Sequence, residues 1–210
     1  MKNLLFDLDG TLIDSSPGIL NGFRYAFEKL GIEQPSVEKI KTFMGPPLEQ
    51  SFQEYFAKPE DVDNAVKVYR EYYLTKGMYE VSFYPGIEDL LDCLKTHPVN
   101  LFVATSKKEE IAIEMLENLK IDNYFTGIYG STSERHNKFA VIEACLQDYQ
   151  LGIETSYMIG DTKYDMLGGK EAQLTCIGVT WGYGSQTDLE SHGADIICHQ
   201  PEDIKKAFGF

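Results

Sequence analysis

From residue 84 onward, short apolar runs alternate with helical patterns, and this alternation restricts the possible folds more than any other feature. We expect strands at Leu101–Ala104, near Ile128, at Tyr157–Ile159, at Thr175–Val179 and near Ile196. Strands that alternate with helices form a parallel sheet that is covered on both faces through right-handed crossovers. A further apolar run, Asn3–Leu8, stops at Asp9 and Gly10 and predicts a first strand. The pattern therefore predicts an α/β fold with a doubly wound parallel sheet.

The segment between residues 15 and 83 lacks this alternation and contains no convincing strand. Apolar residues recur at helical spacing in Pro17–Leu30, and helical runs follow at Val37–Met44, Leu48–Phe56 and Val62–Leu74. We therefore predict an α/β core made of residues 1–14 and 84–210, interrupted by an all-helical domain at residues 15–83. The many aromatic residues of the insertion indicate helix packing, with one or two available to stack on a nucleobase.

The charge and composition exclude several classes of function. The chain has 33 acidic and 19 basic residues among 210, and the resulting net charge of −14 opposes binding to nucleic acid. Its apolar runs are far shorter than the ~20 residues that a membrane-spanning helix needs, and the N-terminus lacks a signal-peptide core. The four cysteines form no C-x-x-C pair that would indicate a zinc site. We expect a cytoplasmic protein that binds no membrane, and the sequence leaves monomer or dimer open.

Residues that could take part in chemistry lie at the ends of the first, second and fourth of the expected strands of the core. They are Asp7, Asp9, Gly10, Thr105, Ser106, Asp161 and Asp165, and Lys138 opens the helix that precedes the strand at Tyr157–Ile159. Ligands of such sheets bind beyond the carboxyl ends of the strands. The sequence therefore predicts that these groups gather at one edge of the sheet.

Carboxylates gathered at one edge repel each other unless a cation lies between them. Oxygen ligands without histidine or cysteine suit Mg²⁺, which readily takes a substrate phosphate oxygen as a further ligand. A carboxylate can also attack phosphorus and form an aspartyl-phosphate. Asp7 and Asp9 lie two residues apart on an extended segment and point to the same side, so one could attack while the other moves protons.

Four motifs of the chain together resemble the haloacid dehalogenase superfamily, specifically its small-molecule phosphatases. They are DLDGT at residues 7–11, Thr105, Lys138 and GDTKYD at residues 160–165. The resemblance implies that Asp7 is the nucleophile and a magnesium ligand. It implies that Asp9 is the general acid and base, with a backbone carbonyl that contacts the metal, and that Asp161 completes the ligand set. The acid at Asp9 argues against a dehalogenase.

The same resemblance assigns the phosphate-binding groups. Thr105 and Lys138, with Gly10 and Ser106, would hold the transferring phosphoryl group. Asp165 would orient Lys138 or a metal-bound water from behind the site.

The insertion is similar to the helical cap of the phosphoglycolate phosphatase-like subgroup, and Phe43, Met44 and Gly45 stand where that cap has its substrate loop. Bacterial 5′-nucleotidases of similar fold share this loop, and Phe139, where many relatives have proline, leans toward them. We therefore expect Mg²⁺-dependent hydrolysis of a small phosphorylated metabolite through an aspartyl-phosphate, with phosphoglycolate as the first substrate and nucleoside monophosphates as the alternative. A phosphomutase is a less favoured second enzyme class, and a non-catalytic binding module is disfavoured by the intact acidic motifs.

Overall fold

The computed structural model describes all 210 residues and divides the chain into two compact units. One unit contains Met1–Asp14 and Phe83–Phe210, and the other contains Ser15–Ser82. Two strands of two residues each, β2 (Ile13–Asp14) and β3 (Ser82–Phe83), pair where the chain passes between the units. The sequence did not indicate them, because two residues are too few to establish a periodicity.

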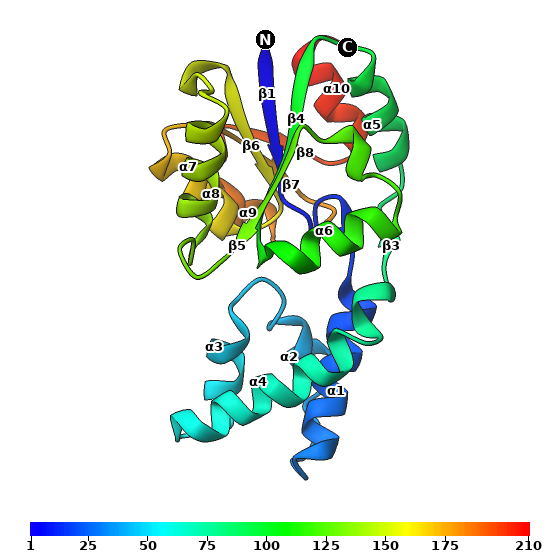
Figure 1. Ribbon diagram of the computed structural model, residues 1–210, viewed down its shortest axis with the longest axis vertical. Helices are drawn as coiled ribbons and strands as arrows, with labels where there is room; N and C mark the ends of the chain where they lie inside the picture. The colour runs from blue at the N-terminus through cyan, green and yellow to red at the C-terminus, as the bar shows by residue number, and fades with distance from the viewer. The chain divides into compact units, whose positions relative to one another are not determined.

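The first unit contains a six-stranded sheet in the order β5-β4-β1-β6-β7-β8, and every neighbouring pair is parallel (Figure 1). Its strands are β1 (Lys2–Phe6), β4 (Val99–Lys108), β5 (Gly127–Ser131), β6 (Ser156–Gly160), β7 (Thr175–Val179) and β8 (Ile196–Cys198). The predicted doubly wound α/β fold is confirmed. β4 is longer than expected, because it continues past Ala104, with a register shift against β5, as far as Lys108.

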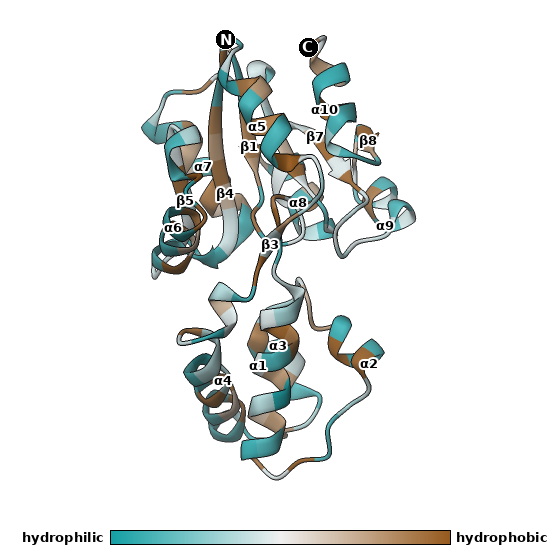
Figure 2. Ribbon diagram, turned by 90° about the vertical axis from the view of Figure 1, so that its right-hand side faces the viewer, coloured by the Kyte–Doolittle hydropathy of each residue, from teal (hydrophilic) through white to brown (hydrophobic).

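Helices cover both faces of this sheet. They are α5 (Ile87–Lys95), α6 (Glu109–Asn118), α7 (Lys138–Asp148), α8 (Lys163–Glu171), α9 (Gln186–Ser191) and α10 (Pro201–Phe208). Helices α5 and α10 pack together on one face, while α7, α8 and α9 follow one another on the other (Figure 1). Leu5, Met158 and Cys176 of the sheet bury their side chains against Val141 of α7 and Met166 of α8. The outer sides of the helices are hydrophilic, and β1 and β4 are largely hydrophobic (Figure 2).

The strand order reverses between β1 and β6, and this reversal fixes the place of the candidate site. The chain runs outward from β1 to β4 and β5, then returns to β6 on the other side of β1. In open α/β sheets the carboxyl ends of the strands at such a switch point form the usual ligand site. Asp7 follows β1 directly, and Asp161 follows β6.

The second unit is helical and buries a cluster of aromatic rings. Its helices are α1 (Ser16–Lys29), α2 (Val37–Lys41), α3 (Leu48–Gln53) and α4 (Pro59–Tyr73). The ring centroid of Phe23 lies 5.1 Å from that of Phe43, 5.2 Å from that of Phe52 and 4.9 Å from that of Tyr69. Offset and edge-on ring contacts at such distances stabilise a core beyond simple apolar burial. None of the helices in either unit has the length and apolar character that crossing a bilayer requires.

Candidate active site

An ion pair between Asp7 and Lys138 forms the centre of the candidate site. The backbone N–H of Asp7 donates to the carbonyl of Ile159 (2.8 Å), which fixes the residue between β1 and β6. Lys138 is the first residue of α7, and its Nζ donates to Asp7 Oδ1 (2.7 Å) and to the carbonyl of Ala104 (2.9 Å). Both side chains are buried, so α7 and β1, far apart in the sequence, join through a desolvated charge pair.

Asp165 completes the surroundings of the lysine from the first turn of α8. Its Oδ1 lies 2.7 Å from Lys138 Nζ. Its Oδ2 accepts hydrogen bonds from the backbone N–H (2.9 Å) and the hydroxyl (2.8 Å) of Thr162, the residue that caps α8. Its Oδ2 is therefore satisfied within α8, while its Oδ1 is buried and has only the ion pair with Lys138. This geometry fits a residue that orients Lys138.

Asp161 lies at the carboxyl end of β6 and is fully buried. Its Oδ1 accepts from the hydroxyl of Thr11 (3.0 Å), and its Oδ2 accepts from the backbone N–H of Tyr183 (2.7 Å). Gly10, with φ of +83°, lies so close that a Cβ atom there would be 2.1 Å from Asp161 Oδ2. The glycine predicted to bind phosphate is thus needed for its backbone conformation and for the space it leaves to Asp161.

Burial and crowding set the charge state of these groups. Burial raises the pKa of Asp7 to about 6, and the charge of Lys138 offsets part of that rise. Burial and the neighbouring charges of Asp165 and Asp7 raise the pKa of Asp161 well above its usual range. Burial opposes the charged form of Lys138, but Asp165 and Asp7 outweigh it and raise the pKa of the lysine. One lysine thus balances only part of the charge of three buried carboxylates.

The remaining negative charge and the donor set fit a divalent cation. Asp7, Asp161 and Asp165 each offer a carboxylate oxygen, and these oxygens lie within 4.8 Å of one another. All three donors are hard oxygen atoms, the kind that Mg²⁺ prefers. Asp7 and Asp161, at the ends of adjacent strands, are therefore near enough to share one ion.

Asp9 has a different environment from Asp7. Its Oδ2 forms an ion pair with Lys107 Nζ (2.8 Å), while its Oδ1 is buried without a hydrogen-bond partner. The Lys107 side chain is only 10% exposed. Sequence reasoning did not pair this lysine with Asp9, since no local pattern pairs a residue of β4 with one that follows β1.

A model of the haloacid dehalogenase-like hydrolases matches residues 4–179. The chain belongs to this family. A 5′-nucleotidase of Pseudomonas aeruginosa is 38% identical over 199 residues, which cover 93% of this chain and 90% of that protein. A phosphoglycolate phosphatase of Aquifex aeolicus is 29% identical over 208 residues, with 98% and 96% covered. A solved structure of a haloacid dehalogenase-like hydrolase from Streptococcus pneumoniae superposes with a TM-score of 0.95 at 43% identity, and 99% of this chain and 98% of that one are covered. The family resemblance read from the sequence is confirmed.

The other predicted site residues of this haloacid dehalogenase-like hydrolase have varied environments. Thr105 is buried within β4, and its hydroxyl accepts from the backbone N–H of Lys107 (3.2 Å). Ser106 is exposed. In the helical unit, Phe43 is 3% exposed, and its ring packs edge-on against Tyr55 within the aromatic cluster.

Met44 of the predicted substrate loop is also buried, whereas Gly45 is exposed and has φ of +100°. The ring contacts of Phe43 make it part of the core of the helical unit. The substrate-loop role of these three residues stays a prediction.

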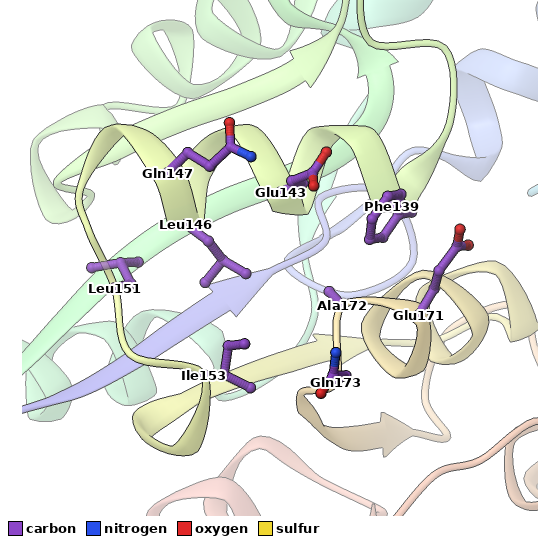
Figure 3. Close-up of a pocket in the computed structure, with 9 residues that line it drawn as sticks. All are labelled: Phe139, Glu143, Leu146, Gln147, Leu151, Ile153, Glu171, Ala172 and Gln173. Atoms are coloured by element: carbon purple, nitrogen blue, oxygen red, sulfur yellow. The ribbon is translucent and has the colours of Figure 1, made fainter.

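A hollow of about 320 Å³, lined by both apolar and polar side chains, lies between α7 and the end of α8 (Figure 3). Its lining residues come from α7, the segment after it, and the end of α8. They are Phe139, Glu143, Leu146, Gln147, Leu151, Ile153, Glu171, Ala172 and Gln173. The lining contains no residue of the carboxylate cluster, so the hollow is separate from the candidate active site.

Proposed function

We propose that this chain hydrolyses small phosphate monoesters with the help of Mg²⁺, with Asp7 as the nucleophile. The observation that carries the proposal is the buried carboxylate of Asp7, which is held by Lys138 and shares the switch point of the sheet with Asp161. The ion pair with Lys138 favours the charged form of Asp7, which has an electron pair for attack.

In the first half of the reaction, a carboxylate oxygen of Asp7 attacks phosphorus. The bond from phosphorus to the ester oxygen breaks, and Asp9 donates its proton to that departing oxygen. In the second half, Asp9 takes a proton from a water molecule whose oxygen attacks phosphorus. The bond from Asp7 to phosphorus then breaks, and inorganic phosphate leaves with both aspartates restored.

Lys138 holds Asp7 in place and presents positive charge to the phosphoryl oxygens, with Thr105 and Ser106 as hydroxyl donors and Gly10 as a backbone contact. Mg²⁺, when bound by Asp7, Asp161 and the backbone carbonyl of Asp9, would neutralise the charge that develops on phosphoryl transfer. Asp165 would keep Lys138 in position.

The substrate class rests on the relatives. The greater identity to the 5′-nucleotidase than to the phosphoglycolate phosphatase, 38% against 29%, makes nucleoside monophosphates a strong candidate beside phosphoglycolate. Phe139, which directly follows Lys138 where many relatives have proline, also favours nucleoside monophosphates.

The test is phosphate release from a panel of nucleoside monophosphates, phosphoglycolate and sugar phosphates, with Mg²⁺ and with chelator. We expect metal-dependent turnover that Asp7→Asn lowers by roughly 10³-fold or more, since removal of a nucleophile abolishes its covalent route. Asp148→Asn is the matched control, because Asp148 accepts a hydrogen bond from Tyr129 at an exposed position. Turnover that survives in Asp7→Asn would remove the nucleophile, and turnover that requires a bisphosphate activator would indicate a phosphomutase.

A further inference from the structure

The loop that follows β7, residues 180–185, contacts the candidate metal ligand Asp161 although it belongs to none of the predicted motifs. The N–H of Tyr183 donates to the Asp161 carboxylate (2.7 Å), and the N–H of Gly184 donates to its backbone carbonyl (3.1 Å). A Cβ atom on Gly182 would lie 2.4 Å from Asp161 Oδ2, and one on Gly184 would lie 2.1 Å from the Asp161 carbonyl oxygen. Only glycine allows the loop to approach this closely.

Trp181 anchors the same loop to the other side of Asp161. Its indole Nε1 donates to the carbonyl of Thr11 (2.9 Å), and the hydroxyl of Thr11 donates to Asp161 Oδ1 (3.0 Å). Thr11 and Asp161 are both fully buried. The two carboxylate oxygens are thus oriented by two donors, one from the loop directly and one from a threonine that the loop's tryptophan contacts.

A buried carboxylate needs such donors, because each favours its charged form and fixes the direction of its lone pairs. Donors behind a metal ligand commonly change metal affinity by about 10-fold to 100-fold when they are removed. Neither Trp181 nor Thr11 needs to touch the ion to have this effect.

We propose that the loop at residues 180–185 is a positioning element for divalent-cation binding, in which Trp181 holds Thr11 and both hold the carboxylate of Asp161. This inference rests on the proposed function for the identity of the ion but concerns affinity for the metal rather than turnover. Trp181 is the sole tryptophan of the chain, so its fluorescence reports on the same network.

The test is Mg²⁺ binding, measured by calorimetry on the full chain without substrate. Trp181→Phe keeps an aromatic ring and loses the N–H donor, and we expect it to weaken Mg²⁺ binding about 10-fold. Thr11→Val, which loses the hydroxyl, should weaken it at least as much, while Thr11→Ser, which keeps it, should retain most of the affinity. Circular dichroism checks that each variant is folded. The tryptophan emission of the unaltered protein should change on addition of Mg²⁺, and Asp161→Asn should abolish that change.

Wild-type affinity in both Trp181→Phe and Thr11→Val, or equal loss in Thr11→Val and Thr11→Ser, would overturn the inference. Phosphate-release assays on the same variants separate the two proposals. Mg²⁺ binding that weakens as expected in a protein without phosphatase activity would remove the proposed function alone. Phosphatase activity with unaltered Mg²⁺ affinity in the variants would remove only the positioning role.

Discussion

The α/β unit and the helical unit differ most in what they bury. The α/β unit buries four charged side chains at the edge of its sheet, namely Asp7, Lys138, Asp161 and Asp165. The helical unit buries no charged side chain, and its interior is built around the aromatic cluster. Buried charges are costly unless they are paired, whereas packed rings stabilise a fold directly. The candidate active site therefore lies among costly buried charges at the edge of the sheet, whereas the interior of the helical unit is built from packed rings.

The largest expected effect comes from Lys138→Met, which replaces the central cation with an apolar side chain of similar length. Asp7 and Asp165 would remain buried without their partner, and we expect a loss of about 3–5 kcal/mol in the free energy of unfolding. Urea unfolding measures it. Lys206→Met is the control, because Lys206 pairs with Asp203 at an exposed position. A fall in the free energy of unfolding of less than about 1 kcal/mol would mean that the ion pairs of Lys138 with Asp7 and Asp165 contribute little to stability.

A smaller effect is expected from Phe52→Leu in the aromatic cluster of the helical unit. Leucine keeps most of the apolar volume but loses the ring contact to Phe23, so the free energy of unfolding should fall by about 1 kcal/mol. Urea unfolding of the variant and of the unaltered protein measures this difference. A loss as large as that of Lys138→Met would contradict the contrast between the two units.

Lys107→Met tests a charge pair that is in the site but outside the buried cluster. Asp9 would lose the ion pair that orients its carboxylate, and we expect kcat to fall about 10-fold because proton transfer depends on that position. The free energy of unfolding should fall by less than in Lys138→Met, because the Asp9 side chain is 21% exposed and keeps some contact with water. A large loss of stability with unchanged kcat would show that the pair is structural.

The smallest effect is expected from Asp195→Asn at the surface of the α/β unit. Burial would raise the pKa of Asp195, but Lys170 and the backbone N–H of Cys176 outweigh it and lower the pKa below the usual 3.8. A lowered folded-state pKa stabilises the protein above the unfolded pKa, and this is lost as the pH falls through the folded value. The variant should therefore be less stable by under about 1 kcal/mol at pH 7. Thermal unfolding across pH should show this difference disappear at acidic pH, and a difference that grows there would contradict it.

The sequence predicted the parallel sheet and the residues at its edge for the same reason. The carboxyl ends of parallel strands share one edge, so motifs that follow separate strands must meet once the strand pattern is known. Asp7 and Asp161 lie together in the structure as that rule requires. Their functional roles remain predictions, because proximity alone does not establish chemistry.

Other features could not be predicted, because they depend on contacts between distant segments. The pairing of Lys107 with Asp9 joins β4 to the loop that follows β1, and the hydrogen bond of Trp181 to Thr11 joins residues 170 positions apart in the sequence. The sequence pattern also gave no range for helices α8 and α9. The buried face of α8 contains Gly168 and Gly169 beside Met166, so its pattern of large apolar residues is weak.

The position of β1 has a consequence for the order in which the protein forms during synthesis. This strand leaves the ribosome before the other strands of its sheet, yet its neighbours β4 and β6 end only at Lys108 and Gly160. The helical unit is complete by Ser82 and depends on contacts within one continuous segment, which form faster than pairings between remote strands. We therefore expect nascent chains to acquire the helical unit first, while the strand that leads to Asp7 can pair on one side only after β4 is made and on the other only after β6 is made.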